Sequence, residues 1–239
     1  MDLKSGYWGS SEYSGCQNDI VCTDYGNYKN EAKSVVFLDI EFKIDEDGDG
    51  YFETKYKNGT GFFLNKAGDY DVNDFPLLVT AGHLYNYKKL GVTPIDIISD
   101  ITHFYVITKY ENKECGTDNT DNKGIQLPGF FNRIALGRSY DEAGLPGYSP
   151  NHDYAVLQAT SNIDRLADYD LEYGAWYKDH DFYNSSNVGY FCIHHPKGDV
   201  KKINKDNHSA DLVTFDGFQL KYDLGLTEKG SSGAPVFNS

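Results

Sequence analysis

The chain has 239 residues, enough for one large β-rich unit or two small domains with a buried core. Its net charge of −14 would repel the phosphates of a nucleic acid, so no nucleic-acid partner is expected. No apolar run approaches the roughly 18 residues that a membrane-spanning helix needs, so no membrane partner is expected either.

Short runs of Val, Ile, Tyr and Phe, broken by Asn, Asp and Gly, follow one another along the chain. This pattern predicts an all-β protein with many turns, and no segment shows sustained helical periodicity. A polar, glycine-rich segment, residues 1–30, comes first, and we expect disulfides rather than a core of its own to hold it. The expected strands cover residues 34–44, 59–65, 75–80, 102–110, 130–136, 188–194, 201–203, 212–215 and 218–222.

Between the first two expected strands, Asp45, Asp47, Asp49 and Gly50 give the Asp-x-Asp-x-Asp-Gly pattern of a calcium loop. However, Tyr56 stands where an EF-hand loop has its final Glu, and strands rather than helices flank the segment. The tip of a β-hairpin is therefore the preferred interpretation, with weak calcium binding as the alternative. No metal and no other cofactor is predicted.

The four cysteines are Cys16, Cys22, Cys115 and Cys192. Their spacing does not suit a zinc site. Disulfides, which imply an oxidising compartment, and buried free thiols are both compatible with this pattern.

Three stretches contain candidate catalytic groups. An apolar strand from Leu77 leads through a small-residue turn to His83, and Asp153 begins a second apolar run. A glycine-flanked turn then presents Ser232, as a serine nucleophile requires. The order His, Asp, Ser is that of chymotrypsin-type enzymes, and Pro235 after the serine excludes the helix that follows an α/β-hydrolase nucleophile.

These stretches contain Thr-Ala-x-His, Asp-x-Ala-x-Leu and Gly-x-Ser-Gly-x-Pro, which resemble the three signatures of the trypsin-like serine peptidases. Within that family the chain is most similar to the bacterial lysyl endopeptidases. The likeness includes Ser-Gly-Cys with Val-Cys in residues 14–22 and Ile-His-His-Pro in residues 193–196. It also includes nearly every residue of the segment around Ser232, residues 225–235.

The resemblance implies two antiparallel Greek-key β-barrels of chymotrypsin type. Residues 31–165 would form the first, with His83 and Asp153, and residues 166–239 the second, with Ser232. It assigns Ser232 as the nucleophile, His83 as the general base and Asp153 as the group that orients His83.

The same resemblance implies an oxyanion hole made by the backbone N–H groups of Gly230 and Ser232. Tyr173 would be an aromatic residue near the substrate site. Cys22 would pair with Cys115, whereas Cys192 has no counterpart and is expected to be a buried thiol.

The chain also departs from the family pattern. It ends at Ser239, soon after Ser232, so an incomplete second barrel is expected. The acid that selects lysine in the lysyl enzymes would lie beyond that point, as would the partner of Cys16. Leu226 stands where trypsin-like enzymes keep their acid, and Ser231 where their zymogens have an aspartate.

The adjacent residues His194 and His195 would point to opposite faces of a strand. They cannot serve one site together, so we expect structural roles for both.

The predicted function is a secreted serine endopeptidase that hydrolyses protein or peptide substrates through an acyl-enzyme, with lysine at the cleaved bond. The residues from Met1 to Lys4 do not resemble a signal peptide, so secretion would require a leader that has been removed, and a cytosolic chain is the other option. Alternatives are a trypsin-fold binding protein without turnover and a peptidase with another preference, such as glutamate.

Overall fold

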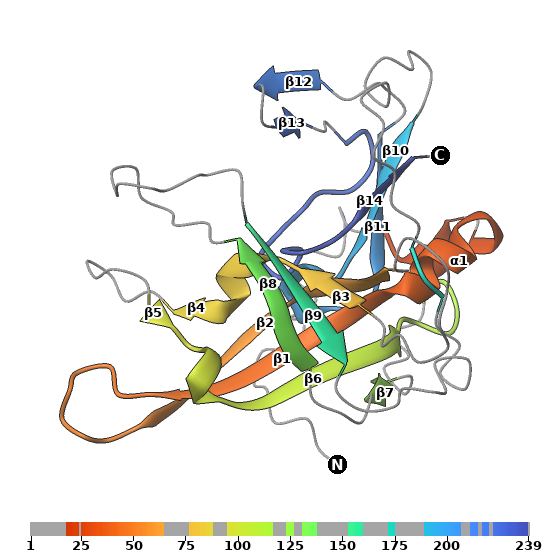
Figure 1. Cartoon of the computed structure of the whole chain (residues 1–239). Helices are drawn as coiled ribbons and strands as arrows, with labels where there is room; N and C mark the ends of the chain where they lie inside the picture. Colours follow the sequence, from red (N-terminus) through yellow and green to blue (C-terminus); the bar gives the residue numbers. More distant parts are fainter. Residues whose placement is uncertain are drawn as a thin grey trace.

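The computed structural model describes residues 18–23, 25–64, 77–87, 95–116, 123–126, 131–137, 153–159, 172–174, 189–206, 211–214, 217–219 and 222–238. Strands dominate these ranges and form two larger antiparallel sheets with two small two-stranded sheets (Figure 1). The predicted all-β class is therefore confirmed. In the described ranges no helix has the length and apolar character needed to span a membrane.

The larger sheet has seven strands in the order β7-β6-β1-β2-β3-β9-β8, and all neighbouring strands are antiparallel. They are β1 (Val35–Ile44), β2 (Glu53–Leu64), β3 (Leu77–Thr80), β6 (Ile101–Tyr110), β7 (Lys123–Gln126), β8 (Phe131–Gly137) and β9 (Tyr154–Ala159). Strand β1 is central, and both of its faces are covered. Leu38 and its alternate neighbours pack into the main core, whereas Phe37 packs into a second cluster on the opposite face. Burial on both faces explains why the first four residues of this strand are all apolar, whereas Asp39, Glu41 and Lys43 alternate with apolar residues in the rest.

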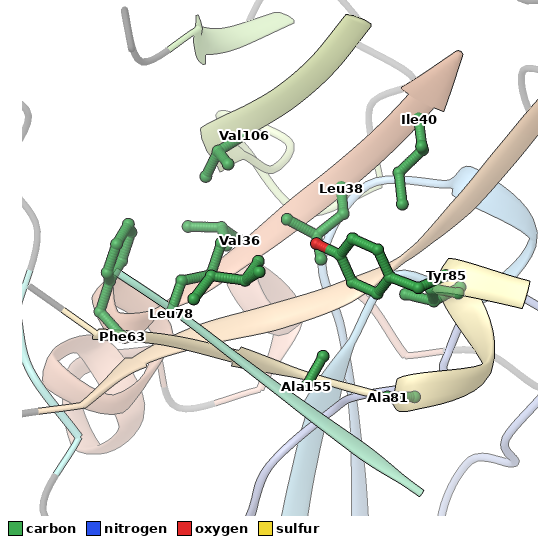
Figure 2. Packing of buried hydrophobic residues seen from close by; sticks show 11 residues of the cluster. Val36, Leu38, Ile40, Phe63, Leu78, Ala81, Tyr85, Val106 and Ala155 are labelled. Carbon is green, nitrogen blue, oxygen red and sulfur yellow. The ribbon is translucent and has the colours of Figure 1, made fainter. Parts of the chain in front are cut away.

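The main core cluster collects side chains from β1, β2, β3, β6 and β9 (Figure 2). Its fully buried members each contribute roughly 1.5–3 kcal/mol through removal of apolar surface from water. The cluster also includes Ala81, Leu84 and Tyr85, which flank His83 in sequence. Core packing therefore fixes the backbone on both sides of the candidate general base.

The predicted β-hairpin around the acidic loop is confirmed, because β1 pairs with β2 from Ile44 opposite Glu53 onwards. The Asp45 carboxylate accepts hydrogen bonds from the amides of Gly48 at 2.7 Å and Gly50 at 2.9 Å. The Asp45 side chain thus closes the turn. Strand β2 begins at Glu53 rather than at residue 59, since its polar first half is held by pairing with β1 rather than by burial.

The second half contains a three-stranded sheet in the order β11-β10-β14 and a small sheet of β12 with β13, whereas the other small sheet, β4 with β5, lies in the first half. The strands are β4 (Asn86–Tyr87), β5 (Ile95–Asp96), β10 (Tyr190–His194), β11 (Lys202–Asp206), β12 (Asp211–Thr214), β13 (Gly217–Gln219) and β14 (Val236–Asn238). Four 3₁₀ turns are described: η2 (Ile20–Cys22), η3 (Gly82–Tyr85), η4 (Ile98–Asp100) and η7 (Pro196–Gly198).

The helix α1 (Tyr25–Ser34) forms although no segment of the sequence shows sustained helical periodicity. Its sequence is polar, and contacts with distant residues hold it in place. The Tyr28 ring packs edge-on against Phe191 with centroids 4.7 Å apart, and Ala32 is buried. The Lys201 ammonium donates to the carbonyl of Ala32 near the helix C-terminus at 2.6 Å, which satisfies one of the free carbonyls there.

The N-terminal segment, residues 18–23, connects the two halves. Cys22 forms a disulfide with Cys115 beside the end of β6, so the pairing implied by the family resemblance is confirmed. Asp19 accepts a hydrogen bond from Asn112 at 2.9 Å and also forms an ion pair with Lys202 of β11. The disulfide links positions 93 residues apart, a loop length for which the chain-entropy model gives about 4.6 kcal/mol of stabilisation.

Of the remaining cysteines, Cys192 is a buried free thiol in β10, as expected. Cys16 lies outside the described residues.

Candidate active site

The position of His83 follows from the register of the large sheet. His83 lies in η3, directly after β3 ends, and β3 pairs antiparallel with β9 so that Thr80 is opposite Ala155. The C-terminal end of β3 therefore lies beside the N-terminal end of β9. This end of the strands is called here the edge of the sheet. His83 and Asp153, distant in sequence, therefore become neighbours at that edge.

His83 and Asp153 share two hydrogen bonds. The Nδ1 atom of His83 lies 2.7 Å from Oδ2 of Asp153, and the His83 amide donates to Oδ1 at 2.8 Å. Burial alone would raise the pKa of Asp153, but the hydrogen bonds from the His83 ring and from the amides of His83 and Gly82 lower that pKa overall. Asp153 is thus an anion that accepts a hydrogen bond from the protonated Nδ1 of His83. This leaves Nε2 of His83 as the free acceptor. The ring is 41% exposed, so Nε2 is accessible to a reacting group.

Ser232 lies in a tight turn formed by residues 228–234, called here the serine turn. The Ser231 amide donates to the Glu228 carbonyl at 2.9 Å, and the Ala234 amide donates to the Ser231 carbonyl at 3.0 Å. Gly230 has a φ of +94°, a conformation that residues with a Cβ rarely adopt. A Cβ there would also lie 2.7 Å from the carbonyl oxygen of His195.

The serine turn packs against the strands that lead to His83. The Thr60 amide of β2 donates to the Ser232 carbonyl at 2.8 Å. A Cβ on Gly233 would lie 2.2 Å from the Thr60 carbonyl oxygen and 2.7 Å from the Ala81 amide, two residues before His83. This close approach across the two halves brings Ser232 to the edge of the sheet where His83 and Asp153 meet.

In the described part of the chain no hydrogen bond joins the Ser232 hydroxyl to the His83 ring. Such bonds are often long before a substrate is bound. The amides of Gly230 and Ser232, the predicted oxyanion-hole donors, also give no hydrogen bond to any described group and are therefore free to bind a ligand oxygen.

Sequence reasoning missed Thr60. This residue is completely buried, and its hydroxyl donates to the Gly230 carbonyl at 2.9 Å. The signal in the sequence is faint: a threonine between Gly59 and Gly61 in an otherwise ordinary strand. The partners of Thr60 lie in the other half of the chain, so local pattern does not reveal them.

His194 and His195 have different partners, as their expected opposite orientations require. Nδ1 of His194 lies 2.6 Å from the Ser231 hydroxyl oxygen. Nδ1 of His195 donates to the Asp199 carbonyl at 3.0 Å, and its ring stacks on Tyr110 with centroids 5.7 Å apart. Burial lowers the pKa of both rings, that of His194 to about 4, so both are neutral in the folded protein at neutral pH.

The family resemblance relates two further residues, Tyr173 and Leu226, to the substrate site. Tyr173 is half-buried and packs against the main core cluster, which includes the residues that flank His83. Leu226 is 38% exposed, just before the serine turn. The role of Tyr173 near the substrate stays a prediction.

Comparison with known proteins identifies the family of the chain. The family model for "Lysyl endopeptidase, C-terminal domain" matches residues 9–239. The protease Anisep from Arthrobacter nicotinovorans has 16% identity and a TM-score of 0.47, over 87% of this chain and 78% of that one. Rv3671c from M. tuberculosis H37Rv has 12% identity and a TM-score of 0.42, over 92% and 76% of the two chains. The family match extends over almost the whole sequence, and the chain therefore belongs to the lysyl endopeptidase C-terminal domain family of trypsin-like serine proteases.

Proposed function

We propose that the protein is a secreted serine endopeptidase whose catalytic residues are Ser232, His83 and Asp153. The observation that carries this proposal is the 2.7 Å contact between His83 Nδ1 and Asp153 Oδ2, at the sheet edge against which the serine turn packs. A hydrogen-bonded acid fixes the tautomer of an accessible imidazole, and a serine turn with two free amides lies beside it.

The mechanism follows from these groups. The Ser232 hydroxyl attacks the carbonyl carbon of the scissile peptide bond while Nε2 of His83 accepts its proton. Asp153 stabilises the resulting imidazolium. The amides of Gly230 and Ser232 donate to the oxyanion of the tetrahedral intermediate.

His83 next protonates the leaving amine, and the C–N bond breaks to leave an acyl-enzyme on Ser232. A water molecule, deprotonated by His83, attacks the acyl carbonyl. Collapse of the second intermediate releases a carboxylic acid and returns the proton to Ser232.

Specificity, location and domain division form the finer part of the proposal. Family membership supports cleavage after lysine. The Cys22–Cys115 disulfide supports an extracellular location, since disulfides persist in oxidising compartments. We assign His83 and Asp153 to a first barrel in residues 31–165 and Ser232 to a second in residues 166–239, after an N-terminal segment in residues 1–30.

The test is labelling of the chain with a fluorophosphonate, followed by peptide mapping. We expect label on Ser232, and loss of label and of peptide hydrolysis in S232A and H83A. The surface variant S99A is the matched control, because Ser99 is exposed and lies in η4, outside the triad. A properly folded chain without label or hydrolysis would favour the binding-protein alternative.

A mixed peptide library tests the specificity. Products that end in lysine support the proposed preference, whereas products that end in glutamate or another residue refute it.

A further inference from the structure

We propose that Thr60 is a positioning residue of the active site, which holds the serine turn in its catalytic geometry and joins it to the strand that carries His83. The inference rests on the proposed peptidase function. Thr60 acts on the reacting groups only through other residues, because its own hydroxyl lies in the interior of the protein.

Every hydrogen-bonding group of Thr60 is in use. Its amide donates to the Ser232 carbonyl at 2.8 Å, and its hydroxyl donates to the Gly230 carbonyl at 2.9 Å. The same hydroxyl accepts the His195 amide at 3.0 Å. Its carbonyl accepts the Thr80 hydroxyl at 2.7 Å. One buried residue therefore connects four segments of the chain.

The two carbonyls that Thr60 holds belong to the two residues that would supply the oxyanion-hole amides. Gly230, with a φ of +94°, has the widest conformational freedom of any residue type, so its own backbone does not keep its amide in one direction. A fixed carbonyl restrains the backbone angles on either side of Gly230, and the bond to Ser232 does the same two residues later. The amides can then remain aimed at one point without a cost of reorganisation during the reaction.

Thr60 also connects the nucleophile with the base. Its carbonyl is bonded to Thr80, the last residue of β3, and His83 follows in η3. Gly59 allows this close packing, because a Cβ there would lie 3.2 Å from the Ser232 carbonyl and 2.4 Å from Leu84. The distance between Ser232 and His83 is thus set through a short chain of hydrogen bonds centred on Thr60.

The hydroxyl can be removed separately from the backbone contacts. Thr60→Val keeps the shape of the side chain and the hydrogen bond from the backbone amide to the Ser232 carbonyl. It leaves the Gly230 carbonyl and the His195 amide without the hydroxyl that they contact. Thr60→Ser keeps the hydroxyl. Thr108→Val is the matched control, since Thr108 is equally buried and lies on β6 opposite Ile125, away from the serine turn.

We would measure kcat and KM for a peptide substrate, the melting temperature, and hydrogen–deuterium exchange in the peptide covering residues 225–237. For Thr60→Val we expect kcat to fall about 30-fold with KM nearly unchanged, because displaced oxyanion donors act on the transition state. Exchange in that peptide should accelerate. Thr60→Ser should restore kcat to within about threefold, and Thr108→Val should lower only the melting temperature.

An unchanged kcat in Thr60→Val, or an equal loss in Thr108→Val, would overturn the proposal. If Thr60→Val does not fold, Thr60→Ala, which adds no volume, replaces it in the same test. Exchange also separates this proposal from the peptidase function. If the wild-type chain is inactive, faster exchange in Thr60→Val than in wild type would still support Thr60 as the residue that holds the turn, and only the peptidase function would be refuted. Unaltered exchange in Thr60→Val would refute the role of Thr60.

Discussion

The Nδ1 atom of His194 lies 2.6 Å from the Ser231 hydroxyl oxygen, directly before the proposed nucleophile in sequence. The Ser231 oxygen also accepts the Glu228 amide at 3.1 Å. Burial keeps the His194 ring neutral, so this bond joins two neutral groups. A neutral hydrogen bond thus occupies the place where zymogens of the wider family keep a charged aspartate, and it holds the serine turn on β10.

The burial of His194 makes stability depend on pH. Burial lowers the pKa of His194 to about 4 in the folded state, against an ordinary value of 6.5 in the unfolded chain. As the pH falls from 6.5 towards 4, the unfolded chain binds a proton that the folded protein does not, so stability is lost across that window. We expect the free energy of unfolding to fall by about 3 kcal/mol from this group.

Urea unfolding between pH 7.5 and 4 measures the effect, with His194→Gln as the comparison. The glutamine oxygen can still accept the Ser231 hydroxyl but does not titrate. The variant should therefore lose less stability on acidification, and equal slopes for the two proteins would contradict the assignment.

Asp153→Asn should reduce kcat/KM by about four orders of magnitude. The amide would no longer be an anion that accepts the Nδ1 proton of His83, so the imidazole loses both its correct tautomer and its stabilised charge. Steady-state kinetics on a peptide substrate measures the loss. Asp47→Asn, in the exposed hairpin loop, is the control and should keep full activity; comparable losses in both variants would argue against the triad.

Gly233→Ala should abolish measurable hydrolysis. The φ of Gly233 is +87°, and a Cβ would lie 2.2 Å from the Thr60 carbonyl, so the serine turn has to move away from β2. Gly48→Ala provides the matched comparison, because Gly48 has a similar φ of +78° but open space around it. That control should cost only about 1 kcal/mol of stability, with kcat unchanged. Similar kinetics for the two variants would exclude steric displacement as the cause.

Asp39→Asn should stabilise the protein at neutral pH. Asp39 is 8% exposed, and burial, followed by the charge of Glu41, raises its pKa to about 6 from 3.8. The stability that protonated Asp39 contributes is complete below pH 3.8 and is lost as the pH rises through 6. The asparagine variant should therefore be more stable than wild type by up to about 3 kcal/mol at pH 7.5.

The gain should disappear near pH 4, where Asp39 is protonated in the folded protein. Chemical unfolding at both pH values decides this. Glu41→Gln is the comparison: it removes the neighbouring charge that adds to the Asp39 shift, but it also loses the bonds from Thr102 and His103 that lower the pKa of Glu41, so any gain should be smaller than that of Asp39→Asn. An equal gain at both pH values would show that the Asp39 charge is not the cause.

The sequence predicted those parts of the fold whose signal is local. The apolar runs of β1, β6 and β10 are long enough to mark these strands to within two residues. The small-residue turn before His83 and the glycines around Ser232 indicated the candidate site, because those backbone shapes require those residue types.

Other features depend on contacts that no local pattern contains. The hydroxyl of Thr60 bonds to a carbonyl 170 positions away in sequence, and nothing around Thr60 indicates such a partner. Helix α1 is polar and lacks clear periodicity, and it is stabilised by Phe191 and Lys201 from the second half. Tertiary contacts override weak local preferences in both cases.

The Cys22–Cys115 disulfide has a consequence for proteolytic nicking of the protein. The exposed hairpin tip between β1 and β2, where Tyr51 is 78% exposed, lies within the loop that the disulfide closes. A single cut at this tip would leave both products joined by the covalent bond and by the pairing of β1 with β2 over ten residues and with β6 over six. The tip has no lysine, so a nick there would come from a protease of another specificity, and the nicked molecule would keep His83 on the same covalent body as its N-terminal segment.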